Sequence, residues 1–323
     1  MGRIRAARVG CGLVCALALA VFSSAAASSG CGDKPKPPPG ICFAKRAKPN
    51  HPVEPGEWLR LMLKYQVGSA GEVFATEDCT GAPIHFTPPP TNCVVRTPPL
   101  GVPRRVPITE ESIIERMLPN EQRLVWIITH RFENGDGFGP AALLRIYKRG
   151  LVVEAIGPLR LRRERVGLEL WKIGRQQLLM ATGETCFDKK NPSTCHRAAN
   201  VLVHRRHAFL DPPISYRDGR CIDVPWVELS READLPLPEG WNRHFEITSS
   251  LSHDERYLVI TEQVEVKDSD PEEPDAPERE VRRIDTDRFI HVEDGRLVTR
   301  QNPLWPKVLP TVGETDVIDK SKL

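Results

Sequence analysis

The sequence lacks the short motifs that mark common catalytic sites. It contains no Gly-x-Ser-x-Gly, no His-Glu-x-x-His, no phosphate-binding Walker loop and no Cys-x-x-Cys. Its formal net charge is only +2, so the strong basic field of a nucleic-acid-binding protein is also missing. Long helices are disfavoured by 30 prolines. We therefore expect no nucleic acid partner, and the sequence names no catalytic residue.

No apolar run is long enough for a membrane-spanning helix, which needs about 20 residues. The longest run extends from Cys11 to Phe22, after three arginines within the first eight residues and before small residues up to Gly30. A basic start, a short apolar run and a small-residue exit are typical of a secretion signal. Residues 1–30 are therefore predicted to be a signal peptide of an exported protein.

The sequence allows two alternative cleavage sites at the end of this signal. Ala25-Ala26-Ala27 fits the small-x-small pattern of the general signal peptidase, which would leave Ser28 first and release the protein outside the cell. Alternatively, Ser28-Ser29-Gly30-Cys31 resembles the lipobox of bacterial lipoproteins, although Ser28 replaces the usual branched aliphatic residue. The resemblance implies lipidation of Cys31 and a membrane anchor in the cell envelope, at the outer membrane or facing the periplasm.

The cysteine count favours the lipid anchor. Of nine cysteines, Cys11 and Cys15 lie in the signal, and lipidation of Cys31 leaves an even six. Export makes disulfides the expected state of these six. Six cysteines allow fifteen connectivities; by proximity along the chain we favour the pairs Cys79–Cys93, Cys186–Cys195 and Cys42–Cys221.

Composition divides the exported chain into four parts. Residues 31–56 are predicted to be a Pro-rich tether, because proline favours extended polyproline II. Residues 57–105 form a small cysteine-containing β segment, and 106–306 form the main body. Residues 307–323 are a polar tail, whose final Ser-Lys-Leu matches a peroxisomal address that an exported chain never presents to its receptor.

The folded parts are predicted to be mainly β, with one short helix and disulfides that staple antiparallel meanders. Alternation over 59–65 predicts a strand, and an acidic first turn before an apolar stripe predicts the helix over 109–118. A unit of one apolar strand, a polar loop and a strand pair follows about three times, with turns such as Asp294-Gly295. The units bear a faint likeness to β-propeller repeats; an irregular barrel or sandwich without true repeats is the alternative.

Three groups of residues are candidates for chemistry. The loop around Glu133, Asn134 and Asp136 resembles the calcium loops of integrin-type propeller repeats, with fewer acidic positions; no other cofactor is suggested. For zinc, His204 and His207 are an odd number of residues apart and face opposite sides of a strand, so we expect no metal site with His196. The third group is a basic string of Arg160, Arg162, Arg163 and Arg165. These arginines could bind an acidic partner or lipid headgroups, or they could be the charges that protect an exposed strand edge.

The sequence therefore favours a non-catalytic binding or assembly module, with an envelope protein as a candidate partner. The alternative is a secreted hydrolase that uses loop carboxylates such as Glu133, Asp136 and Glu184, since a pair of carboxylates is all that such chemistry needs. Whether two of them share a cleft distinguishes these alternatives.

Overall fold

The computed structural model describes residues 40–46, 51–88, 93, 101–147, 150–186, 195–223, 226–237, 241–270 and 278–304. The predicted signal, the lipidation candidate Cys31 and the predicted tail 307–323 lie outside these ranges. No helix in the described ranges is long and apolar enough to cross a membrane.

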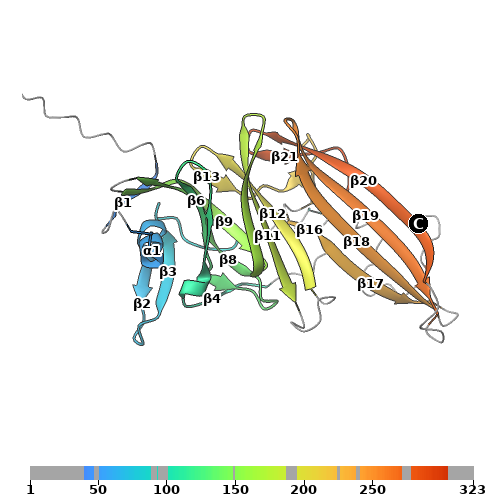
Figure 1. Cartoon of the computed structure of the whole chain (residues 1–323), viewed down its shortest axis with the longest axis horizontal. Helices are drawn as coiled ribbons and strands as arrows, with labels where there is room; N and C mark the ends of the chain where they lie inside the picture. Colours follow the sequence, from blue (N-terminus) through green and yellow to red (C-terminus); the bar gives the residue numbers. More distant parts are fainter. Residues whose placement is uncertain are drawn as a thin grey trace, which may run out of the picture. The chain divides into compact units, whose positions relative to one another are not determined.

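The single α-helix of the described residues lies where alternation predicted a strand. Helix α1 (Pro55–Met62) is followed by a hairpin of β2 (Leu63–Val67) and β3 (Val73–Asp78), so the predicted strand over 59–65 is wrong before Leu63 (Figure 1). Pro55 suits the first helical turn, Glu54 and Glu57 form a capping box, and Trp58, Leu61 and Met62 are buried. That i, i+3, i+4 spacing places the three side chains on one helix face.

The helix predicted over 109–118 is wrong. Only one 3-10 turn, η1 (Glu110–Ser112), forms there, capped by Thr109, and the chain continues as β5 (Ile113–Met117). β5 pairs antiparallel with β6, placing Ile113 opposite Ile127 and Ile114 opposite Trp126. The β-branched residues Ile113 and Ile114 suit this pairing better than they suit a helix.

The first large sheet curls until its end strands meet. Its main order is β10-β11-β12-β13-β9-β8-β6-β5, and β5 contacts β10. All eight strands contribute to one apolar cluster, for example through Leu143, Leu159, Leu179 and Phe209. Gly157 lets β13 approach β9, since a Cβ there would lie 1.9 Å from the Phe209 carbonyl oxygen. The twelve strands of this sheet are β1 (Cys42–Lys45), β4 (Arg104–Arg105), β5, β6 (Gln122–Ile127), β7 (His130–Arg131), β8 (Gly137–Tyr147), β9 (Gly150–Leu161), β10 (Glu164–Ile173), β11 (Gln176–Cys186), β12 (Cys195–Arg205), β13 (Ala208–Leu210) and β16 (Trp226–Glu228).

The second large sheet is built around three long antiparallel strands, β18 to β20 (Figure 1). Its inner residues, such as Leu258 and Ile290, share an apolar cluster with Met180 and Val201 from the outer side of the curled sheet, so the two sheets pack face to face. The strand order is β15 (Cys221–Asp223), β14 (Ile214–Ser215), β21 (Arg296–Val298), β20 (Arg279–Glu293), β19 (Tyr257–Ser269), β18 (Asn242–His253) and β17 (Ser230–Pro236).

The predicted mainly-β, disulfide-stapled fold is confirmed. The curled sheet corresponds to the barrel alternative, and the packing of the second sheet against it corresponds to the sandwich. The predicted turn at Asp294-Gly295 is present and joins β20 to β21. The sequence pattern of the third unit also suggests two separate strands, Val281 to Ile284 and Phe289 to Val292, but both belong to one continuous strand, β20. The propeller likeness and the domain boundaries stay predictions, although Cys42–Lys45 within the predicted tether is a strand on β9.

Two disulfides join Cys42 to Cys79 and Cys93 to Cys221, so the predicted pairs Cys79–Cys93 and Cys42–Cys221 are wrong. The four cysteines are the predicted ones, but proximity along the chain does not decide which sulfurs meet. Cys42 and Cys79 both pack against the apolar cluster that contains Trp58. That cluster brings β1 and the end of β3 together.

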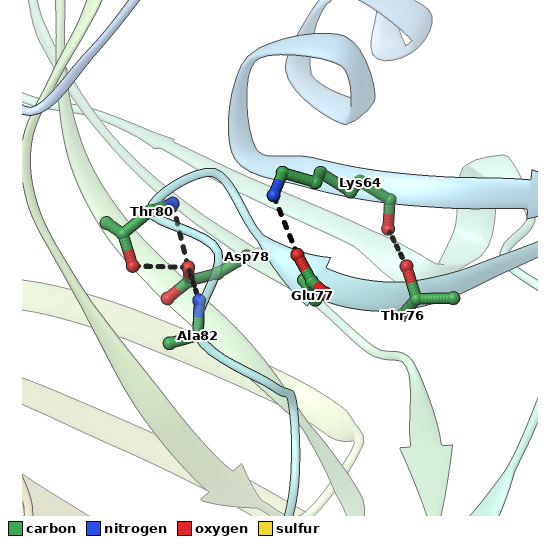
Figure 2. A network of polar contacts seen from close by, with 6 residues as sticks. All are labelled: Lys64, Thr76, Glu77, Asp78, Thr80 and Ala82. Atoms are coloured by element: carbon green, nitrogen blue, oxygen red, sulfur yellow. Dashed lines mark hydrogen bonds and ion pairs between the residues drawn. The ribbon is translucent and has the colours of Figure 1, made fainter.

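A turn at Asp78 holds Cys79 in place (Figure 2). Asp78 Oδ1 accepts the backbone N–H groups of Thr80 at 2.8 Å and of Ala82 at 3.1 Å, and the Thr80 hydroxyl at 2.6 Å. Beside it, the Lys64 ammonium contacts Glu77 at 2.7 Å across the β2–β3 hairpin. The turn therefore sets the backbone direction at the disulfide.

The side chains of the third predicted pair, Cys186 and Cys195, lie outside the described residues. The backbone register places Cys186 directly opposite Cys195 in the antiparallel pair β11–β12. This register is compatible with a Cys186–Cys195 disulfide, which stays a prediction.

Candidate functional site

The predicted calcium loop lies between β7 and β8, and Asp136 is its buried residue. Only 1% of the Asp136 side chain is exposed. Asn134 and Asp136 bond to each other twice: the Asn134 amide donates to Asp136 Oδ2 at 3.1 Å, and the Asp136 N–H donates to Asn134 Oδ1 at 3.1 Å. Gly135 between them has φ +87°, a conformation that favours glycine.

The partner of Asp136 is Arg160 on β9. Arg160 donates to Asp136 Oδ2 from Nη2 at 2.7 Å and from Nε at 3.1 Å, and its side chain is 14% exposed. The β8–β9 register makes this contact, because Phe138 lies opposite Arg160 at the end of the loop. A carboxylate buried to this degree requires such a charged partner.

Aromatic rings enclose the Arg160 guanidinium. Its central carbon lies 4.2 Å from the centre of the Trp226 ring and 5.2 Å from that of Phe132. The Arg162 guanidinium lies 5.9 Å from the same Trp226 ring, so Arg160 and Arg162 share one face of β9. These distances are within the range of cation–π attraction. We call Asp136, Arg160, Phe132 and Trp226 the arginine cluster.

These contacts give the predicted calcium ligands other partners. Glu133, 83% exposed, faces Arg104 at 3.6 Å, while Asp136 Oδ2 receives donors from both Arg160 and Asn134. Asp136 Oδ1 is buried without a hydrogen-bond partner among the described residues. Within those residues no group of three or more His, Cys, Asp or Glu side chains is placed to hold a metal ion.

Asp211, which follows β13, is a titratable residue that the sequence reasoning missed. The residue as a whole is solvent-exposed, but neighbouring protein atoms partly desolvate its carboxyl group. This desolvation raises the pKa of Asp211 from 3.8 to about 7, against the opposing positive charge of Arg160. Asp211 is followed by Pro212-Pro213, a sequence typical of an ordinary loop, so the local sequence gives no sign that its pKa is raised.

The remaining predicted side chains are held in separate contacts. The buried Glu184 pairs with Arg165 at 3.0 Å, and Arg163 pairs with Glu111 at 3.1 Å. Together with Arg160, these pairs place three of the four predicted arginines in ion pairs within the chain. Glu184 and Asp136 therefore form ion pairs with different arginines.

The predicted histidines also have separate partners. His204 Nδ1 contacts Gln177 at 2.9 Å, and burial lowers the pKa of His204. His207 Nδ1 contacts the Glu154 carbonyl at 3.1 Å. The His196 side chain lies outside the described residues.

A scan against protein-family models finds no match, and searches of curated proteins and of solved structures find no similar chain.

Proposed function

We propose that the chain is an exported protein of the bacterial cell envelope, anchored by lipid at Cys31, that acts as a non-catalytic binding or assembly module. Membrane attachment is through the N-terminal lipid, and the partner is another envelope component. The two disulfides support export, because such bonds persist in oxidising compartments. The lipobox likeness and the even cysteine count support the anchor.

The observation that favours a binding role over hydrolysis is that each candidate carboxylate is engaged by an arginine of its own. Glu133, Asp136 and Glu184 contact Arg104, Arg160 and Arg165 respectively. An acid–base pair needs two carboxylates that face one substrate bond. Three carboxylates that each contact a different arginine serve the scaffold instead.

The anchor is tested by expressing the full chain in a bacterial host and separating membrane from soluble fractions. We expect the wild type in the membrane fraction with a lipidated N-terminus at Cys31 by intact mass, and Cys31→Ser in the soluble fraction. Cys15→Ser is the matched control, because it removes a cysteine of the signal and should leave the anchor intact. Wild-type protein that begins at Ser28 and carries no lipid would refute the anchor.

One observation favours the alternative of a secreted hydrolase. The pKa of about 7 makes Asp211 a carboxyl group that is partly protonated at neutral pH, as a general acid must be. The discriminating experiment measures hydrolysis of glycan and peptide substrates by wild type, Asp211→Asn and, as a control at an exposed acid outside the candidate carboxylates, Asp218→Asn. Activity that Asp211→Asn abolishes and Asp218→Asn preserves would establish the hydrolase, whereas the binding role predicts no turnover by any of the three.

A further inference from the structure

The long strand β20 has one backbone edge that is mostly unpaired within the described part of the chain. Its other edge pairs with β19 from Arg279 to His291. On the open side, β21 pairs only with His291, Val292 and Glu293. No other described strand hydrogen-bonds to β20, so residues 279–290 present their outward N–H and C=O groups without a partner strand. Such an edge is a template for pairing with another chain.

Contacts beyond β21 show which residues of β20 point their backbone groups outward. The Gln301 side chain accepts the Phe289 N–H at 2.8 Å and donates to the Asp287 carbonyl at 2.9 Å. The Thr299 hydroxyl donates to the Phe289 carbonyl at 2.8 Å. Outward groups recur every second residue along a strand, so those of Arg283 and Asp285 also face the open edge. The described side chains stop covering this edge at Asp287.

The open stretch has opposite charges in its two halves. The first half holds Arg279, Arg282 and Arg283 with one acid, Glu280, and the second half holds Asp285 and Asp287, with Ile284 between the halves. Arg288 in the second half is buried in an ion pair with Glu262, so the exposed charges of the two halves have opposite net sign. The Arg283 and Asp285 side chains are 50% and 59% exposed, and they lie 3.7 Å apart on the outer face. An antiparallel copy of this stretch would place each half opposite the half of opposite charge.

We propose that this edge of β20 binds the same edge of a second copy of the chain, antiparallel and centred on Ile284. Arg283 of each copy then faces Asp285 of the other, and their outward backbone groups exchange hydrogen bonds across the two-fold axis. If the register between the two β20 strands shifts by one residue, the outward backbone groups of one strand lie opposite inward-pointing groups of the other and cannot bond to them. A shift that keeps the outward groups together instead places Arg283 opposite Arg283, or Asp285 opposite Asp285, and like charges directly opposite are destabilising.

The inference goes beyond the proposed function and does not depend on it. It names a partner, a second copy, and joins the two second sheets into one continuous sheet. Arg283 already contacts Glu265 at 3.0 Å within its own sheet, which holds its guanidinium beside the edge. Because exposed charges set the register, the association should weaken as salt screens them.

The test measures the mass of the full exported chain by sedimentation over a concentration series. The measurement compares wild type, Arg283→Asp, Asp285→Arg and the double charge swap. We expect each single reversal to weaken the dimer at least about tenfold, since it places like charges opposite, and the double swap to restore it. Lys172→Glu, a reversal of an exposed charge on β10, is the control that should not change the dimer. Melting curves of all variants establish that each is folded.

Register is tested by cysteine crosslinking. Ile284 lies on the proposed two-fold axis, so Ile284→Cys should form a crosslinked dimer on mild oxidation. Val281→Cys is the control, because Val281 faces Asp287 of the other copy and should not crosslink to itself. A monomer at every concentration would overturn the proposal, as would a dimer that ignores the reversals or one that crosslinks through Val281 instead of Ile284. These outcomes are independent of whether Cys31 carries lipid.

Discussion

At the scale of single residues, the Asp136 carboxylate is tightly constrained. It is nearly inaccessible, and its charge is balanced by Arg160, which is itself enclosed by Phe132 and Trp226. A buried ion pair is weak evidence for net stability, but removing one partner leaves an uncompensated buried charge. The arginine cluster is therefore sensitive to a change on one side only.

We expect Arg160→Ala to lower the free energy of unfolding by about 3 kcal/mol or more, measured by urea denaturation. Arg104→Ala is the matched control, because its ion pair with Glu133 is 83% exposed on both sides and lies in the same loop region. Its loss should change stability by no more than roughly 0.5 kcal/mol. Equal effects of the two substitutions would contradict the buried role of Arg160.

Asp211 predicts a pH dependence with a definite sign. Its pKa is about 7 in the folded chain, above the ordinary value of 3.8, so the folded state binds the proton more tightly than the unfolded state. Stability that comes from the protonated form is full below pH 3.8 and is lost as the pH rises through about 7. The charged carboxylate is therefore unfavourable at pH 8.

Asp211→Asn should raise the melting temperature at pH 8 by about 2–4 °C, the shift that roughly 1 kcal/mol gives in a domain of this size, and should change little at pH 4. Solvent access to Asp211 keeps the gain modest. Asp218→Asn provides the contrast, because hydrogen bonds from Arg220 lower the pKa of Asp218, so this substitution should not stabilise at pH 8. A loss of stability in Asp211→Asn at pH 8 would refute the raised pKa.

At the scale of elements, the errors in secondary structure have a common cause. Leu59, Leu61 and Leu63 alternate, but Trp58, Leu61 and Met62 also have helical spacing, and the cap at Glu54 and Pro55 decides in favour of α1. Conversely, the acidic turn at Thr109 suits a helix start, but pairing of β5 with β6 extends the chain from Ile113. Short apolar runs fit both the helical and the strand period, so the cap or the neighbouring strand decides which structure forms.

Disulfide connectivity is the prediction that belongs to this scale. Proteolysis without reduction, followed by mass spectrometry, should yield linked peptides for Cys42–Cys79 and Cys93–Cys221. We expect Cys186–Cys195 as the third pair from the β11–β12 register. A linked peptide that contains Cys79 and Cys93 would contradict the structure.

The two bonds should differ in their effect on stability. Cys93→Ser opens a closure of 128 residues and Cys79→Ser one of 37. In the chain-entropy model these closures contribute about 5 and about 4 kcal/mol respectively. Urea denaturation of the two variants should therefore rank Cys93→Ser as the less stable.

At the scale of the whole molecule, the two sheets share one apolar layer and should unfold together. Ile260 on β19 is fully buried in the cluster that also contains Val201 from β12. Ile260→Ala should lower stability by about 2–4 kcal/mol. Hydrogen exchange should show the same loss of protection in β8 as in β19. Loss confined to β19 would mean that the sheets unfold independently.

The sequence alone determined features that depend on neighbours in the chain. The predicted turn at Asp294-Gly295 is present because both residues tolerate positive φ. Along β19 the alternating residues Leu258, Ile260, Val264 and Val266 are buried. The closure of the curled sheet, the disulfide partners, the contact of Asp136 with Arg160 and the raised pKa of Asp211 were decided only by the tertiary structure. Each joins residues distant in sequence, and charge balance, burial and sulfur pairing depend on which atoms meet in space.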